Sequence, residues 1–398
     1  MPVSVRIRLS VLMFLQYFTW GAWYVTMGTY LMTTLKTDAV EMGAAYANLS
    51  IAAIISPFFI GLVADRFFAA QRVLAVLHLT GAAILTWISY VPDFSSFWWL
   101  ILLYTLLYMP TMSLANAVSF RQMTDTERQF PTVRVFGTAG WIIAGLLIGF
   151  MGLEATAAPF RIAAASSLLL GGYSLFLPHT PPARTPVKLS DILGLDALVL
   201  FKQRNYVVFF ITAITICIPL AFYYSLANPF LNAIGVENAA GKMTLGQVFE
   251  SVFLLAMPFL FRKLGVKKML LLGMSCWILR YVFFAYGDNH AQVWMLYAGV
   301  LLHGACYDFF FVTGQIYTDQ RADVTVRSAA QGLITFATYG IGMLIGSYVS
   351  GFVASHNSTT VGNVLQYDWR HIWLAPAALS GVVMVCFFFL FKDHTRKS

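Results

Sequence analysis

The chain has 398 residues, of which 59% are hydrophobic and only 11% are charged, and its net charge is +8. A soluble chain averages roughly 45–50% apolar and about 25% charged residues, so this composition excludes an ordinary soluble globular protein. Apolar runs of about 20 residues recur along the sequence, and each is long enough to cross a hydrocarbon core. Basic loops in such a protein mostly report orientation, so the positive charge does not indicate a nucleic-acid partner.

The apolar runs predict an all-α polytopic membrane protein with twelve transmembrane helices. Lipid forces every backbone polar group to be satisfied within a helix or a closed barrel, and these runs lack the alternation of barrel strands. The predicted helices cover residues 9–34, 42–64, 73–91, 97–118, 131–153, 160–178, 205–232, 243–261, 269–287, 293–317, 328–353 and 371–391.

The longest polar interruption lies between the sixth and seventh predicted helices. It predicts an N-terminal six-helix bundle over residues 1–178, a linker with a short amphipathic helix over 179–204, and a C-terminal six-helix bundle over 205–398. Most of the 25 Lys and Arg residues fall in the tails, the linker and the loops on one side of the predicted helices. The protein is therefore expected in a bacterial inner membrane, with both termini on the cytoplasmic side. Two bundles around a central site are a common plan for secondary transporters.

Ionisable side chains inside a membrane are functional candidates, because each costs about 2.5–3.5 kcal/mol at the centre of a helix. Two acids and two arginines fall deep in predicted helices, with two histidines that can stay neutral beside them: Glu250, Asp308, Arg134, Arg280, His78 and His303. In the first helix, Gln16, Trp20 and Trp23 rank below these, because Trp near a helix end is usually an interfacial anchor.

The loop after the second helix contains Gly61, Asp65 and Arg66. These residues resemble the G-x-x-x-D-R loop of the major facilitator superfamily, in which the acid can complement a neighbouring helix N-terminus. The alternative is an ordinary short charged loop.

The fifth predicted helix carries Arg134, Thr138 and Trp141 on one face, at spacings i, i+4 and i+7. Pro131 suits its first turn. A guanidinium, a hydroxyl and an indole on one stripe can bind a polar, planar or ribose-like solute, or hold the charge of an acid. The alternative is that Arg134 extends to the cytoplasmic interface.

The seventh predicted helix is interrupted by Pro219 and Pro229, and between them Tyr224 and Asn228 lie at i, i+4. Broken helices near the midplane often line transporter sites, so both residues are candidate substrate contacts.

The eighth predicted helix has a single polar stripe that contains Thr244, Gln247, Glu250 and Ser251. Burial favours the neutral form of Glu250 and a nearby cation favours its charged form, so this acid can exchange a proton during transport. Gln247 is the candidate substrate contact beside it. The alternative is a glutamate held permanently in a structural hydrogen-bond network.

The tenth predicted helix supplies Tyr307 as a candidate substrate contact and Asp308 as a second candidate proton carrier. Arg280, in the ninth helix, is the obvious cation to neutralise Asp308. If these two residues pair, the acid is structural.

Over nearly its whole length the chain resembles the nucleoside:proton symporter family of the major facilitator superfamily. The segments that carry this resemblance are FLQYFTWGAWY, YMPT, FPTVRVFGTAGW, LGLDALVLFK, GQVFE, ILRYVFFAYGD and YDFFFVTG. The resemblance implies twelve helices, uptake driven by a proton gradient and a central nucleoside site. By matching positions, it points to Arg134, Thr138, Trp141, Gln247, Glu250, Tyr307 and Asp308. Well-studied members place a Gln and an Asn where this chain has Ala221 and Tyr224, which removes two amide contacts.

The sequence contains no Walker loop, no HExxH or GxSxG motif and no His/Cys cluster with metal spacing. We therefore expect no enzyme activity and no cofactor. The predicted function is a monomeric proton-coupled symporter that imports nucleosides by alternating access, with proton coupling at Glu250, Asp308 and Arg134. One alternative is a carrier of a sugar, glycoside or modified nucleoside, or an uncoupled facilitator. A membrane-embedded transferase is a remote alternative, because the polar loops are short.

Overall fold

The computed structural model describes residues 1–59, 68–182, 195–323, 326–361 and 364–392. The chain forms two compact units, which we describe separately. Unit 1 comprises residues Met1–Leu189 and Glu237–Thr244, and unit 2 comprises Ser190–Val236 and Leu245–Ser398. The bundle bounds inferred from the sequence stay a prediction.

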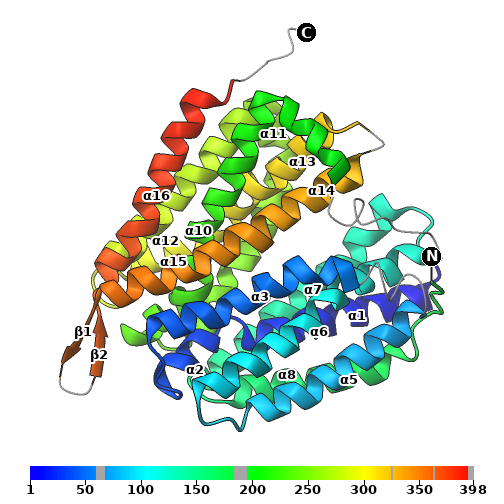
Figure 1. Cartoon of the computed structure of the whole chain (residues 1–398), viewed down its shortest axis with the longest axis horizontal. Coiled ribbons are helices and arrows are strands. Elements are labelled where there is room, and N and C mark those ends of the chain that lie inside the picture. Colours follow the sequence, from blue (N-terminus) through cyan, green and yellow to red (C-terminus); the bar gives the residue numbers. More distant parts are fainter. Residues whose placement is uncertain (60–67, 183–194, 324–325, 362–363, 393–398) are drawn as a thin grey trace. The chain divides into compact units, whose positions relative to one another are not determined.

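Unit 1 is built from helices that pack alongside one another. They are α1 (Val3–Trp23), α2 (Met27–Thr33), α3 (Ala39–Phe59), α5 (Ala70–Ile88), α6 (Phe94–Arg121), α7 (Thr126–Phe150) and α8 (Ala158–Ser174). α1 packs mainly against α7 and α8, while α5 packs against α8 and α6 (Figure 1). The first helix, α1, therefore holds both α7 and α8 in place within this unit.

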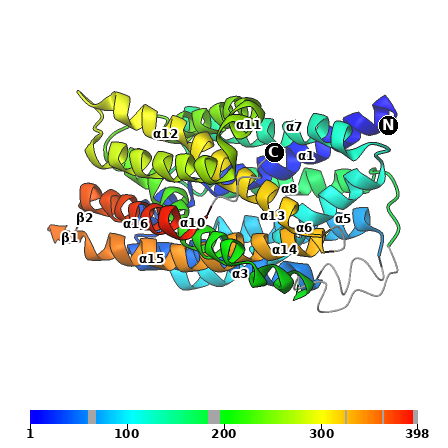
Figure 2. The ribbon, with the colours of Figure 1, turned by 90° about the horizontal axis from the view of Figure 1, so that it is seen from above.

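Unit 2 contains the remaining elements, apart from the first residues of α11, which cluster with unit 1. They are η2 (Leu195–Lys202), α10 (Arg204–Ala233), α11 (Ala239–Tyr286), α12 (Val293–Tyr307), η3 (Asp308–Val312), α13 (Thr313–Arg321), α14 (Arg327–Thr335), η4 (Phe336–Gly342), α15 (Met343–His356), β1 (Ser358–Val361), β2 (Val364–Tyr367) and α16 (Trp369–Leu390). α10 packs against α15, α16 and η4, and Figure 2 shows α15 and α16 beside α10.

Each of the twelve predicted spans coincides with helix in the described part of the chain. Nine helices there are long and apolar enough to cross a membrane. One of them, α11, covers the eighth and ninth predicted spans, because only Gly265, with φ 69° and ψ 177°, interrupts it. The tenth span is α12, η3 and α13 in succession, and the eleventh is α14, η4 and α15, with η3 and η4 as π-helical segments.

Three details differ from the sequence expectation. The first span is divided into α1 and α2. The linker helix is a 3₁₀ helix, η2, of which Ala197 and Leu200 are buried, and residues 183–194 lie outside the described part. An antiparallel hairpin that the sequence did not predict joins α15 to α16, with Ser358 paired to Tyr367. Gly61, Asp65 and Arg66 lie outside the described residues, so the G-x-x-x-D-R interpretation stays a prediction.

Aspartate caps fix the start of three helices. The side chains of Asp93, Asp125 and Asp368 accept hydrogen bonds from backbone N–H groups in the first turns of α6, α7 and α16. The N–H of His371 lowers the pKa of Asp368 below its ordinary value. Because Asp125 caps α7 at Thr126, Pro131 lies in the second turn, not in the first turn as predicted.

In unit 1, α1 and α7 approach each other closely at two glycines of α7. A Cβ on Gly140 of α7 would lie 2.2 Å from the carbonyl oxygen of Phe14 in α1, and a Cβ on Gly137 would lie 2.6 Å from the Tyr17 ring. Small residues allow this close approach between membrane helices. The contact sets how the face of α7 that carries Arg134 lies against α1.

We expect Gly140→Ala to destabilise the protein by about 1–3 kcal/mol, because the new methyl group would overlap the Phe14 carbonyl. Thermal unfolding of purified protein in detergent measures this change. The matched control is Gly172→Ala in α8, where an added Cβ meets nothing within 4 Å. This control should be neutral or slightly stabilising, since Ala favours helix more than Gly does. Equal effects of the two substitutions would contradict the close approach of α1 and α7.

Candidate functional site

In unit 1, α7 places Arg134, Thr138 and Trp141 on one half-buried face, as the spacing predicted. The guanidinium carbon of Arg134 lies 3.9 Å from the centroid of the Tyr17 ring. A cation over an aromatic face is stabilised by about 0.5–1 kcal/mol or more. Arg134 therefore has an aromatic partner on α1, within the same unit.

An aromatic cluster surrounds Trp141. Its ring meets Trp20 edge-on at 5.4 Å and Tyr24 at 6.4 Å, and Trp20 lies 6.1 Å from Tyr108. The indole N–H of Trp20 is buried and has no hydrogen-bond partner among the described residues. The sequence interpretation ranked Trp20 as an interfacial anchor, but the structure places it beside the predicted site residue Trp141. The regular spacing of Tyr17, Trp20 and Tyr24 was the signal for this cluster.

Behind these rings lies a buried polar network that joins four helices. His78 Nε2 lies 3.0 Å from Gln16 Oε1 and His78 Nδ1 lies 3.1 Å from Ser167 Oγ, while Gln16 Nε2 donates to Thr111 Oγ1 at 2.7 Å. The Ser167 hydroxyl also lies 2.9 Å from the His78 backbone carbonyl, to which it can donate, and Thr111 donates to the Tyr108 carbonyl. These contacts connect α1, α5, α6 and α8 within unit 1.

In unit 2, glycines bring α11 and α12 together at Glu250. A Cβ on Gly304 of α12 would lie 2.3 Å from the Cα of Glu250, and a Cβ on Gly246 of α11 would lie 3.0 Å from the Cβ of His303. Glu250 and Gln247 are half-buried, whereas Val252 on α11 is exposed. Glu250 thus belongs to the part of α11 that packs against α12.

The polar stripe predicted on this helix is shorter in the structure. The Thr244 hydroxyl donates to the Gly241 carbonyl at 2.7 Å, and the exposed Ser251 hydroxyl donates to the Gln247 carbonyl at 3.4 Å. Both hydroxyls are therefore occupied by their own helix, and Gln247 and Glu250 remain as the candidates.

Asp308 lies one helical turn after Gly304, so the two predicted proton carriers come from neighbouring positions of α11 and α12–η3. Asp308 is 1% exposed, and its Oδ2 atom has no hydrogen-bond partner among the described residues. The ion pairs found between described residues involve neither Asp308 nor Arg280. The structural pairing that the sequence left open is therefore not observed.

Arg280 is fully buried and has other partners. Its guanidinium carbon lies 3.4 Å from the centroid of Tyr223, and its Nη1 donates to His303 Nδ1 at 3.1 Å. Because Nδ1 accepts this bond, His303 is a neutral imidazole with its proton on Nε2. Arg280 thus places a positive charge in unit 2 without an ion pair that would fix the Asp308 carboxylate.

The remaining candidates of unit 2 divide into two groups. Tyr224 meets the His303 ring edge-on at 6.2 Å, and Tyr307 lies 6.4 Å from the same ring, so the structure brings these two together. Asn228 is fully buried, and Asn232 Nδ2 donates to its backbone oxygen at 2.9 Å and to its Oδ1 at 3.3 Å. Asn228 is therefore contacted by Asn232 of its own helix, and the Tyr307 hydroxyl forms a hydrogen bond with the Tyr339 hydroxyl.

Ala221 of α10 is one of the two positions at which this chain differs from the family pattern, and it lies in a helix contact. Ala221 is 2% exposed, and a Cβ on Gly346 of α15 would lie 2.7 Å from the Ala221 Cβ. α10 and α15 are thus in direct contact at this position, where Gly346 has no side chain.

Comparison with known proteins gives these features a context. Residues 3–396 match the family described as Nucleoside H+ symporter. The chain belongs to this family. It is 42% identical to YegT of Escherichia coli (strain K12), over 98% of this chain and 94% of that protein, and 35% identical to the xanthosine permease of the same strain, over 98% and 96%.

A solved structure agrees with the family assignment. The crystal structure of the nucleoside transporter NupG superimposes with a TM-score of 0.90 at 32% sequence identity, over 98% of this chain and 100% of that chain. This match confirms the major-facilitator fold that the sequence predicted. The family and these relatives are transporters and permeases, so the expectation of a proton-coupled nucleoside transporter, and not an enzyme, is confirmed.

Proposed function

We propose that this member of the nucleoside:proton symporter family imports nucleosides across a bacterial inner membrane as a monomer, with both termini in the cytoplasm. Transport follows the alternating-access plan of secondary transporters, in which two helix bundles rock around a central site. The substrate contacts we assign are Arg134, Thr138, Trp141, Tyr224, Asn228, Gln247, Glu250 and Tyr307. Glu250 carries the coupled proton, and Asp308 and Arg134 adjust its charge.

The observation that carries this proposal is the environment of Glu250. It is a half-buried carboxylate in a membrane-length helix, and its backbone packs against Gly304, which lies one turn before the buried acid Asp308. A charged side chain inside a membrane costs free energy, so an acid in such a position is a candidate for a functional role. Protonation from the outer side makes Glu250 neutral while the substrate binds, and the higher internal pH then removes the proton.

Aromatic contacts replace amide contacts in the proposed nucleoside site. Ala221 is buried against α15 and has no polar group, whereas Tyr224 is half-buried beside His303. A tyrosine can stack on a base or donate one hydrogen bond, whereas each amide contact that is absent removes about 0.5–1.5 kcal/mol. We therefore expect base recognition to depend more on stacking than it does in relatives with both amides.

Uptake into proteoliposomes tests the proposal. With an inward proton gradient, labelled uridine and adenosine should accumulate, and raising the external pH at constant internal pH should reduce accumulation. A protonophore should reduce it to equilibration. Competition by sugars or glycosides without competition by nucleosides would indicate a different substrate class. Uptake of nucleosides that ignores the proton gradient would indicate an uncoupled facilitator.

A further inference from the structure

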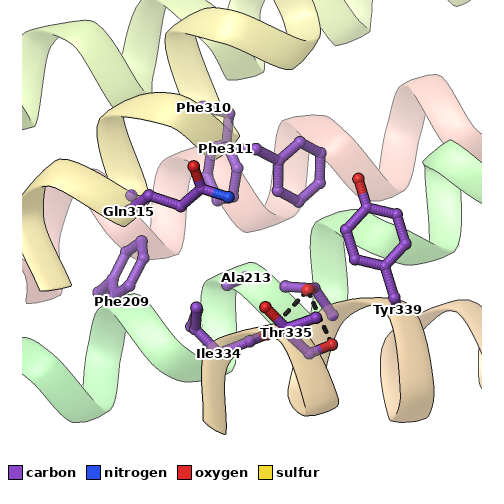
Figure 3. A pocket seen from close by; sticks show the side chains of 10 residues that line it. Phe209, Ala213, Phe310, Phe311, Gln315, Ile334, Thr335 and Tyr339 are labelled. Carbon is purple, nitrogen blue, oxygen red and sulfur yellow. Dashed lines mark hydrogen bonds between the residues drawn. The ribbon is translucent and has the colours of Figure 1, made fainter. Parts of the chain in front are cut away.

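A small hollow in unit 2 lies between α10, α13 and η4, where Phe311, Gln315 and Tyr339 line it (Figure 3). Its volume of about 20 Å³ is room for about one water molecule. Small-molecule pockets have volumes of roughly 300–1,000 Å³. The hollow is therefore too small for an organic ligand, whereas the surface of the same unit carries a charged patch.

The patch surrounds the end of α16, which is held by two other helices of unit 2. The Lys267 ammonium, in α11, donates to the backbone oxygen of Phe388 in α16 at 2.8 Å and lies 5.0 Å from the centroid of the Phe388 ring. One turn later, the Lys392 N–H donates to Asn205 Oδ1 at 3.2 Å, and Asn205 Nδ2 donates to the Lys392 backbone oxygen. The segment of α11 after Gly265 and the start of α10 are therefore both fixed beside the end of α16.

Basic side chains from all three helices gather at this place. Arg204 is the first residue of α10, and the last residue of η2, two positions earlier, is also basic. We call five residues the basic patch: Lys202, Arg204, Lys267, Lys268 and Lys392. Lys267 is half-buried and the other four are exposed. The ion pairs found between described residues include none of the five, so acidic side chains in that part of the chain do not neutralise them by pairing.

Exposed apolar side chains lie on the same elements as the patch. Phe388 and Phe389, in the last turn of α16, are 53% and 73% exposed, and Leu198 and Val199 of η2 are 43% and 45% exposed. Cations next to apolar side chains suit a membrane interface, where the cations meet head groups and the apolar groups meet acyl chains. A soluble anion would contact only the charges.

We propose that the basic patch binds the head group of an anionic phospholipid of the surrounding membrane. The phosphate oxygens accept hydrogen bonds from the ammonium and guanidinium groups, and an acyl chain lies along Phe388 and Phe389. Basic residues on one side of a membrane protein follow from its orientation. Orientation does not require that they gather from three helices around one helix end, whereas clusters of roughly four to eight Lys and Arg beside a membrane-spanning helix are typical of anionic-lipid sites.

Thermal unfolding of protein purified in dodecyl maltoside tests this site. Dioleoyl phosphatidylglycerol should raise the Tm of wild-type protein more than dioleoyl phosphatidylcholine does, because a ligand that binds only the folded state stabilises it. The test variant is Arg204→Gln with Lys268→Gln, which removes two exposed charges. The phosphatidylglycerol concentration that gives half of the maximal shift should rise by roughly 30-fold, at about 1 kcal/mol for each basic residue.

The matched control is Arg72→Gln with Arg121→Gln, which removes two exposed charges from unit 1 on the side of the membrane where the patch is expected. This variant should keep the wild-type response. Equal loss of affinity in the two double variants would overturn the site, because it would show a diffuse effect of charge.

Two results with wild-type protein alone would also overturn the proposal. An equal Tm shift with both phospholipids would show that the lipid charge is not recognised. An equal shift with glycerol 3-phosphate, which lacks acyl chains, would show a site for soluble anions. Native mass spectrometry gives a second readout, since wild-type protein should retain bound phosphatidylglycerol that the Arg204→Gln, Lys268→Gln variant loses, and equal retention would contradict the site. These measurements use no nucleoside, so their failure leaves the proposed function in place.

Discussion

Glu250→Gln is expected to abolish proton-driven accumulation of nucleoside while nucleoside exchange across the membrane continues. Glutamine resembles the protonated acid in shape and can still donate a hydrogen bond, but it cannot release a proton. Each coupled proton provides about 2.3 kcal/mol per 100 mV, which corresponds to a roughly 40-fold concentration ratio. The variant should therefore equilibrate its substrate to a ratio of about 1 where wild-type protein concentrates it. Accumulation and counterflow of labelled uridine in the same proteoliposomes measure the two activities.

The matched control for this change is Glu237→Gln, because Glu237 is an exposed carboxylate just before α11. It should accumulate uridine as wild-type protein does. Asp308→Asn is measured in parallel, since Asp308 is the other candidate proton carrier, is 1% exposed and lies one turn from Gly304. Normal accumulation by Glu250→Gln together with its loss in Asp308→Asn would move the proton carrier to Asp308.

The lipid environment explains why the spans were predictable and their interior details were not. Hydrocarbon thickness fixes the length of an apolar helix, so α10 and α16 lie close to the predicted ranges 205–232 and 371–391. The π-helical segments η3 and η4 lie inside equally apolar runs. The π-helical register leaves no change in the sequence period, so the apolar pattern could not predict it. The strands β1 and β2 are short and lie between two long apolar helices, so the sequence shows no alternating pattern that would predict the hairpin.

For the candidate site, spacing along one helix was informative and pairing between helices was not. The i, i+4, i+7 rule placed Arg134, Thr138 and Trp141 on one face of α7. It could not show that Tyr17 lies under the Arg134 guanidinium, because that contact depends on how α1 meets α7 at Gly140. In the same way, the sequence left open whether Arg280 pairs with Asp308, and the structure shows its hydrogen bond with His303. Charge alone suggests a partner, and packing decides which partner is reached.

Arg134→Lys is expected to raise the KM for nucleosides by roughly 10- to 150-fold, the range that one hydrogen bond to a charged group covers. Lysine keeps the charge and loses the planar, multi-donor guanidinium that lies over the Tyr17 ring. Because the contact is made to the bound substrate, the KM should change more than kcat. Initial uptake rates over a range of uridine concentrations separate the two constants.

Arg128→Lys is the matched control, because Arg128 is exposed on the same helix and pairs with Asp125 at 3.6 Å. An exposed pair of this kind contributes little, so uptake by this variant should match wild-type protein. Tyr17→Leu provides an independent check, since it removes the ring below the guanidinium and leaves Arg134 in place. If Arg134 acts on substrate from a position fixed by the ring, Tyr17→Leu should also raise the KM, by a smaller factor than Arg134→Lys. If Arg134 only extends to the membrane interface, lysine should replace it without loss and Tyr17→Leu should leave the KM unchanged.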